Sequence, residues 1–209
     1  LFAYRIEISS ADYQRIATTQ AELAGSFTDE FIVNIPKKTV LDFIKIFDGV
    51  GNVTVETDKR QIVFKADNIT MSSKLIEKYI KSLTRLFQIE YNLRASINRS
   101  MLAEVVRRIS AITSEITHGV QLSFNGNQLT VTSLETEHGK GNEIIDNVQF
   151  EGEQIDIIFN ARHLLEILTN TNAENITFAM NTKTQPALIL PDNNEAKYLL
   201  VPISIEKLV

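Results

Sequence analysis

The chain has 209 residues, of which 44% are hydrophobic and 22% are charged, and its formal net charge is −5. This is the composition of an ordinary globular protein, and the acidic balance argues against a protein whose whole surface coats nucleic acid. Because cysteine is absent, disulfides, thiol catalysis and sulfur-ligated metal sites are excluded, and a reducing, cytoplasmic compartment is expected. No stretch approaches the roughly 18 consecutive apolar residues that a membrane helix needs.

The first clear element is an extended segment that runs into an amphipathic helix. From Phe31 to Ile35, apolar residues recur at every second position, which predicts a half-buried strand. From Lys37 to Asp48 they recur three and four positions apart, which predicts one apolar stripe on a helix. Pro36 at the junction suits a first helical turn, because its missing N–H costs nothing there. Strands are then predicted at residues 53–55 and 62–64.

The same order of elements occurs twice more. Helices are predicted from Arg99 to Ile112 and from Asn160 to Asn170, and the junctions at Pro36, Asn98 and Asn160 lie 62 residues apart. Both asparagines suit N-caps, because a short amide side chain accepts a bond from a free backbone N–H. Strands follow each helix, with a hairpin turn predicted at Asn125-Gly126.

Apolar residues occupy equivalent positions in the three helices, so the repeat concerns packing as well as element order. The matched positions are Val40, Leu102 and Leu164, then Phe43, Val105 and Ile167, then Ile44, Val106 and Leu168. Each unit reads as a strand, a helix and about three strands. One helix cannot cover both faces of a sheet, so two such units are expected to pack as an α+β domain, with the helices on one face of curved antiparallel sheets.

Three units make one and a half such domains, so we expect the chain to lack a beginning. The chain also opens at Leu1 without a methionine. No linker rich in proline, glycine or serine separates the units, and the seam is expected near Gln88. The sequence therefore predicts two domains, residues 1–88 and residues 89–209.

Four short motifs stand in a characteristic order and spacing. They are Ala11-Asp-Tyr-Gln-Arg15-Ile-Ala17, Met71-Ser-Ser-Lys74-Leu75, Phe159-Asn-x-Arg-x-Leu-Leu-Glu166 and Tyr198-Leu-Leu-Val-Pro202-Ile203. Together they resemble the bacterial DNA sliding clamp, the beta subunit of DNA polymerase III, over nearly the whole chain. The sequence departs from the family pattern at Tyr13 and Gln14, where the family usually has glycine and histidine.

The resemblance implies a DNA-clamp fold of three similar domains, each with two repeat units. Two such chains close head to tail into a homodimeric ring around duplex DNA. The present chain would hold the second half of the middle domain and all of the C-terminal domain. Its implied role is that of a processivity factor with no chemistry and no cofactor of its own. The implied partners are duplex DNA, the alpha and clamp-loader subunits of DNA polymerase III, and repair polymerases.

Positive charge is concentrated on the three predicted helices, which sum to +3 in a chain of net charge −5. The resemblance implies that these helices line the hole of the ring, where attraction to phosphates is independent of sequence. The alternative is an ordinary solvated helix face. The candidate DNA-facing residues are Lys37, Lys38, Lys45, Arg99, Arg107, Arg108 and Arg162.

The resemblance also implies a cleft between the middle and C-terminal domains that takes short peptides, such as Gln-Leu-x-Leu-Phe, from polymerases and repair proteins. Large apolar anchors in a preformed groove would supply the affinity. By pattern alone, the apolar members could equally be plain core. The candidate lining is Ala11, Tyr13, Gln14, Arg15, Ile16, Arg85, Leu86, Asn160, His163, Pro186, Leu199, Leu200, Val201, Pro202 and Ile203.

Two further expectations concern assembly and catalysis. Ile112 and Thr113 would lie at the ring interface, unless they form only the polar end of a helix. The histidines, His118, His138 and His163, are scattered without metal-ligand spacing, and no nucleophile motif or phosphate-binding loop is present. An enzyme is therefore not expected. The alternative to a clamp is a repeat-built protein-interaction module without a role on DNA.

Overall fold

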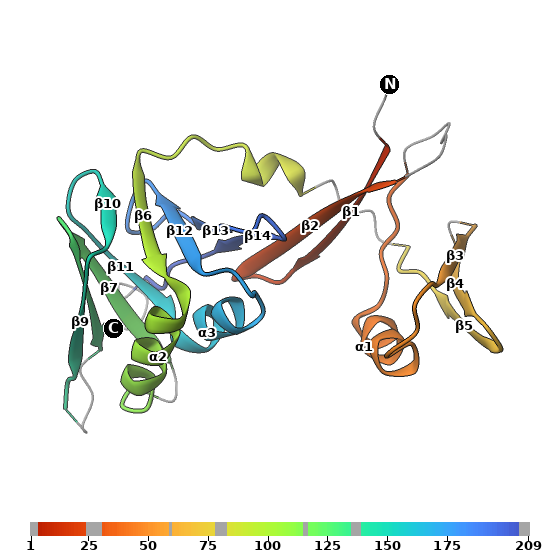
Figure 1. The fold of residues 1–209 in the computed structure, drawn as a ribbon, viewed down its shortest axis with the longest axis horizontal. Helices are drawn as coiled ribbons and strands as arrows, with labels where there is room; N and C mark the ends of the chain where they lie inside the picture. The colour runs from red at the N-terminus through yellow and green to blue at the C-terminus, as the bar shows by residue number, and fades with distance from the viewer. Residues whose placement is uncertain are drawn as a thin grey trace. The chain divides into compact units, whose positions relative to one another are not determined.

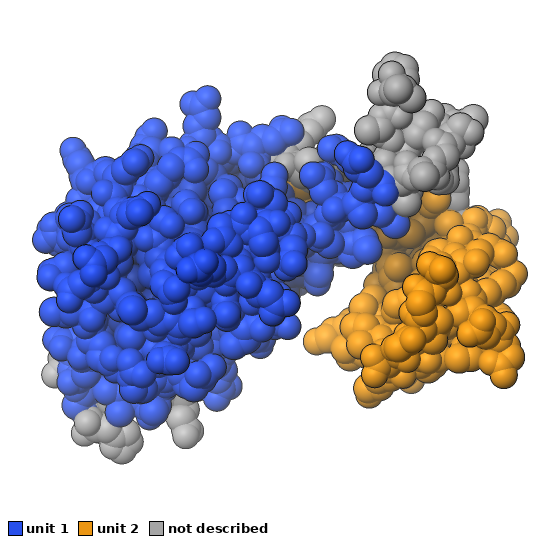
Figure 2. All heavy atoms as spheres, in the orientation of Figure 1, with its two compact units in different colours: residues 1–25, 85–209 blue, residues 26–84 orange. Residues whose placement is uncertain are grey.

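A computed structural model describes residues 4–23, 31–58, 60–77, 83–114, 117–134 and 139–204 of the chain. The chain divides into two compact units, one of residues 1–25 with 85–209 and one of residues 26–84, which Figure 2 colours separately. The α+β class is confirmed, because the described residues form antiparallel sheets and α-helices in the order that the repeat predicts.

The smaller unit contains one helix and one three-stranded antiparallel sheet. Its elements are α1 (Lys37–Ile46), β3 (Thr54–Thr57), β4 (Gln61–Ala66) and β5 (Ile69–Lys74). The strands lie in the order β3-β4-β5. Phe43 packs its ring against Phe47 and Phe64, with ring centroids 4.9 and 4.6 Å away, so aromatic contacts join the helix to the sheet.

The strand predicted from Phe31 to Ile35 is wrong, because residues 31–36 form no strand. The N–H of Ile76 donates to the carbonyl of Asn34 at 2.8 Å, yet no ladder forms. Alternating apolar residues predict which face of a strand is buried, but a strand also needs a neighbouring backbone along its length. Pro36 occupies the N-cap position, one residue before α1 begins.

The larger unit is built on a seven-stranded antiparallel sheet and a four-stranded one (Figure 1). The first sheet has the order β1 (Tyr4–Ala11), β2 (Arg15–Leu23), β14 (Lys197–Leu200), β13 (Ala187–Pro191), β12 (Asn175–Met180), β6 (Leu93–Asn98) and β10 (Gln149–Glu151). The second has the order β11 (Ile155–Asn160), β7 (Gly119–Asn125), β8 (Gln128–Ser133) and β9 (Asn142–Asp146). A short 3-10 helix, η1 (Thr84–Phe87), precedes β6.

Helices α2 (Arg99–Ser110) and α3 (Ala161–Thr169) pack side by side (Figure 1). The predicted N-caps are confirmed, because the side chain of Asn98 accepts from the N–H of Met101 at 3.0 Å and that of Asn160 caps α3 in the same way. Arg99 joins the two helices, since its guanidinium donates to the carbonyl of Leu168 at 2.9 Å, near the end of α3 where carbonyls lack helical partners.

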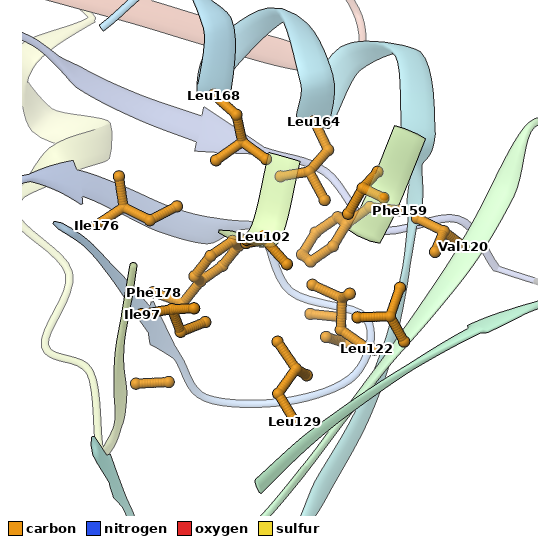
Figure 3. Close-up of a cluster of buried hydrophobic side chains, with 14 of the residues drawn as sticks. Ile97, Leu102, Val120, Leu122, Leu129, Phe159, Leu164, Leu168, Ile176 and Phe178 are labelled. Atoms are coloured by element: carbon orange, nitrogen blue, oxygen red, sulfur yellow. The ribbon is translucent and has the colours of Figure 1, made fainter. Parts of the chain in front are cut away.

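The main core lies between this helix pair and both sheets (Figure 3). Leu102 of α2 and Leu164 of α3 are fully buried in it, as are Leu122 and Phe178 from the two sheets. The longest described helix, α2, has 12 residues. No helix in the described part of the chain has the length and apolarity that a bilayer crossing requires.

Candidate peptide-binding pocket

A pocket of about 240 Å³ opens in the larger unit where three segments meet. These segments are the turn between β1 and β2, the start of α3, and the tail that follows β14. The lining residues are Gln14, Asn160, His163, Val201, Pro202, Ile203 and Ser204.

The β1–β2 turn is held in shape by Asp12. Its carboxylate accepts from the N–H groups of Gln14 and Arg15 at 2.8 and 3.0 Å, and the N–H of Asp12 donates to the carbonyl of Arg15. This is the local bonding by which an aspartate stabilises a tight turn. The turn therefore presents Gln14 to the pocket from a defined backbone.

The tail is fixed on both sides by backbone hydrogen bonds. The N–H of Val201 donates to the carbonyl of Gln14 at 2.8 Å, and the N–H of Ile203 donates to the carbonyl of Ile158 at 2.7 Å. The tail thus runs from the hairpin turn to β11, the edge strand of the second sheet. A single chain segment closes the pocket and connects the two sheets.

The start of α3 supplies the polar wall. The side-chain oxygen of Asn160 accepts from the N–H groups of Arg162 and His163 at 3.0 and 3.3 Å, while the N–H of Ala161 donates to the carbonyl of His118. His163 stands in the first turn, half-buried. Its Nδ1 is buried and has no hydrogen-bond partner among the described residues.

An ion-pair network lies beside the pocket. The Arg15 guanidinium contacts the carboxylate of Asp12 at 3.1 Å and also pairs with the carboxylate of Glu166. Burial raises the pKa of the Asp12 carboxyl, but the bonds from Gln14 and Arg15 outweigh it and leave that pKa below its ordinary value. Arg15 is therefore neutralised by two carboxylates and links the hairpin turn to α3.

Burial lowers the pKa of the His163 imidazole, and the nearby Arg15 charge lowers it further. Asp12 and Glu166 oppose this effect only in part. His163 is therefore neutral at neutral pH. Chemically, the pocket offers apolar surface from the tail and uncharged hydrogen-bonding groups from the turn and from α3, which suits an apolar side chain carried on a peptide backbone.

Two family models match the chain, and they cover most of it. The model described as the DNA polymerase III beta subunit, C-terminal domain, matches residues 84–204, and the model of the central domain matches residues 4–79. The chain belongs to the DNA polymerase III beta subunit family. The predicted resemblance is thereby confirmed.

The relatives of this family chain are named beta sliding clamps. Those of Chlamydia pneumoniae and Vibrio cholerae are 28% and 25% identical over 200 and 198 residues, which are 95% and 94% of this chain. In both cases the chain spans 54% of the relative's length.

Solved structures share the fold. The DNA polymerase III beta subunit of Pseudomonas aeruginosa has a TM-score of 0.90 at 21% identity, with 96% of this chain and 55% of that chain covered. The sliding clamp of Bartonella birtlesii, solved with griselimycin bound, has a TM-score of 0.89 at 24% identity, with the same coverage. The clamp fold predicted from the repeat is confirmed.

The compact units divide the chain differently from the family models. The hairpin β1–β2 falls within the central-domain model, yet it pairs with β14 and extends the sheet of the larger unit. The candidate pocket therefore contains residues from the matches to both models within one compact unit.

The structure brings six of the predicted cleft residues together at the pocket and adds Ser204, which the sequence analysis missed. Arg15 lies behind the pocket in its ion pairs, and Tyr13 is fully exposed at the hairpin turn. Of the other predicted residues, Ala11 ends β1 on the exposed surface and Pro186 is half-buried just before β13. Ser204 carried no apolar or motif signal that could have identified it.

The remaining cleft candidates divide between core and surface. Leu200 is fully buried in the main core, while Leu199 is buried in a second cluster against which Ile16 packs. The reading of these aliphatic residues as core therefore fits their burial. Leu86 of η1 is 43% exposed, and the side chain of Arg85 lies outside the described part of the structure.

The candidate DNA-facing residues differ in their surroundings. Arg99 is half-buried and bonded to backbone carbonyls, and Arg108 pairs with Glu143 at 2.7 Å. The Arg108–Glu143 pair raises the pKa of Arg108 and lowers that of Glu143. The exposed candidates are Lys37, Lys38 and Lys45 on α1, Arg107 on α2 and Arg162 on α3.

The candidate interface pair follows α2. Ile112 and Thr113 are half-buried, and the hydroxyl of Thr113 donates to the carbonyl of Ser110 at 2.8 Å. His138 lies outside the described residues. Within the described ranges, no group of three or more metal-ligating side chains occurs.

Proposed function

We propose that this chain is part of a DNA sliding clamp, a processivity factor that tethers a replicative polymerase to duplex DNA in the cytoplasm. The proposal assigns it no chemical step. The complete protein would act as a homodimeric ring, with Ile112 and Thr113 at its interface. We assign residues 1–88 to the middle clamp domain and 89–209 to the C-terminal one, and the two family models meet close to this border.

The observation that carries the proposal is the pocket, because it forms from motifs far apart in the sequence. Gln14 belongs to the first family motif, Asn160 and His163 to the third, and Pro202 to the last. A shallow pocket with an apolar floor and convergent uncharged polar groups suits a short peptide. Peptides from the alpha and clamp-loader subunits of DNA polymerase III and from repair polymerases are the proposed ligands.

The exposed cations on the helices support the DNA part of the proposal. Lys38 and Arg107 are exposed on α1 and α2. Cations at the surface of a helix attract phosphates without reading bases, as a ring that slides must do. Arg99 is left out of this set, since its guanidinium already serves the packing of α2 on α3.

Peptide binding tests the pocket directly. The probe is Gln-Leu-Ser-Leu-Phe with blocked ends, titrated into the protein in a calorimeter. We expect Val201→Asp, which places a charge on the apolar wall, to weaken binding at least about tenfold. The matched control is Ile144→Asp, because Ile144 is an exposed aliphatic residue on β9. Absence of binding by the unaltered protein, or equal losses in both variants, would overturn the peptide assignment.

DNA association separates the clamp from the protein-interaction module. That module is favoured by one finding, since Arg99 and Arg108 are engaged within the chain. The double variant Lys38→Glu/Arg107→Glu should weaken duplex binding and reduce its salt dependence by about one phosphate contact for each residue. An unchanged salt dependence in fluorescence anisotropy would favour the module.

A further inference from the structure

His163 is the one pocket residue whose charge can change near neutral pH, since the other lining residues are Gln14, Asn160, Ser204 and three apolar residues of the tail. It stands in the first turn of α3, half-buried. Because its Nδ1 is enclosed and unpartnered among the described residues, the imidazole is already partly removed from water before any ligand arrives.

We propose that His163 couples ligand binding in this pocket to the proton concentration, so that a peptide binds the neutral imidazole and protonation of His163 releases it. This inference rests on the proposed function, because it assumes that the pocket takes a peptide. It adds a regulatory property that belongs to this chain's own histidine.

The geometry favours a neutral imidazole when a ligand is bound. In the imidazolium both ring nitrogens carry N–H groups, so Nδ1 would become a buried cationic donor without an acceptor. In the neutral ring Nδ1 can be the unprotonated nitrogen, whose missing partner costs less. An apolar anchor against Val201 and Ile203 would displace water from the pocket and increase the cost of the charged form.

The charged groups around His163 come from every segment that packs near it. Arg15 of the hairpin disfavours a second positive charge, and so does His118, which precedes β7. Asp12 of the hairpin and Glu166 of α3 favour the charged form. The burial of the ring and the Arg15 charge prevail, and the pKa of His163 lies below its ordinary value. The titration is therefore expected on the acid side of neutrality.

The test measures the affinity of the blocked Gln-Leu-Ser-Leu-Phe peptide, which has no ionisable group, from about pH 7.5 to about pH 5. We expect the affinity to fall at least about threefold over this range, with a limiting slope of about tenfold per pH unit for one proton. Circular dichroism at each pH checks that the protein stays folded, because a histidine with a lowered pKa also makes folding less favourable as the pH falls.

Substitutions assign the effect to His163. His163→Gln should bind with a pH dependence of less than about twofold, because glutamine does not titrate in this range. His118→Gln is the matched control and should keep the dependence of the unaltered protein. Arg15→Gln should move the midpoint to higher pH and Glu166→Gln to lower pH, since these charges act on His163 in opposite directions.

The outcomes separate the inference from the function beneath it. Binding that is strong at neutral pH and unchanged on acidification would overturn the inference alone, as would an identical pH curve for His163→Gln. Absence of peptide binding at every pH would overturn the proposed function and the inference with it. Binding that strengthens on acidification would also contradict the inference, because the imidazolium would then be the favoured form.

Discussion

The repeat unit of α1 and the two units of α2 and α3 share one sequence pattern but bury it differently. Val40 of α1 is 41% exposed, whereas Leu102 and Leu164, at the equivalent positions of α2 and α3, are fully buried. Ile44 is 60% exposed, and its counterparts on α2 and α3 are also fully buried. Equivalent apolar residues therefore lie on the surface in one unit and in the core in the others.

The difference is confined to one face of the helix. Toward its own sheet α1 is packed like α2, because Phe47 is 6% exposed and the equivalent Ile109 is 4% exposed. The exposed positions are those that in α2 and α3 meet the core between the paired helices. A single unit can bury one side of its helix against its strands, and the other side is buried only when a second helix packs beside it.

The largest contrast should come from a charge placed on this face. Val106→Asp would bury a carboxylate in the main core and should cost about 4 kcal/mol or more. Ile44→Asp at the equivalent exposed position should change the free energy of unfolding by about 0.5 kcal/mol or less. Urea unfolding followed by circular dichroism measures both. Equal losses would show that Ile44 is buried in solution.

A smaller contrast should come from truncation. Leu102→Ala would leave a cavity and should cost about 2–5 kcal/mol. Val40→Ala removes a side chain that is 41% exposed and should cost less than about 1 kcal/mol. The measurement is the midpoint and slope of urea unfolding for each variant. A similar cost for the two would break the comparison, since it would place Val40 in a packed environment.

The smallest contrast concerns the helix starts. Asn98→Ala removes the bond from the N–H of Met101 and should cost about 1 kcal/mol, whereas Asn98→Asp keeps an acceptor and should cost little. Pro36 makes no side-chain cap, so Pro36→Asn should change stability by less than about 0.5 kcal/mol, as the new cap offsets the lost chain restriction. Thermal unfolding of the three variants gives the comparison, and a stabilising Asn98→Ala would contradict it.

Local patterns predicted the helices, the two asparagine caps and the hairpin turn at Gly126, where φ is +55°. These features depend on side-chain spacing and on single-residue conformational preferences, which are written in neighbouring positions. The failed strand at residues 31–35 and the pairing of Thr18 with Lys197 depend on backbone partners that no local pattern specifies.

The pocket shows the same limit. Motif resemblance pointed to Gln14, Asn160 and Pro202, which the fold brings together. It could not separate Val201, which lines the pocket, from the preceding Leu200, which is fully buried in the core. Which side chain points to the pocket is set by the register of β14 in its sheet, and a one-residue shift reverses it.

Hydrogen–deuterium exchange with and without the blocked Gln-Leu-Ser-Leu-Phe peptide tests the central claim most directly. It compares the two apolar surfaces that the chain offers, the pocket and the exposed face of α1. The account predicts slower exchange at residues 12–15, 160–163 and 201–204, with no change at residues 37–46. Protection confined to α1, with unchanged exchange at the pocket, would contradict it.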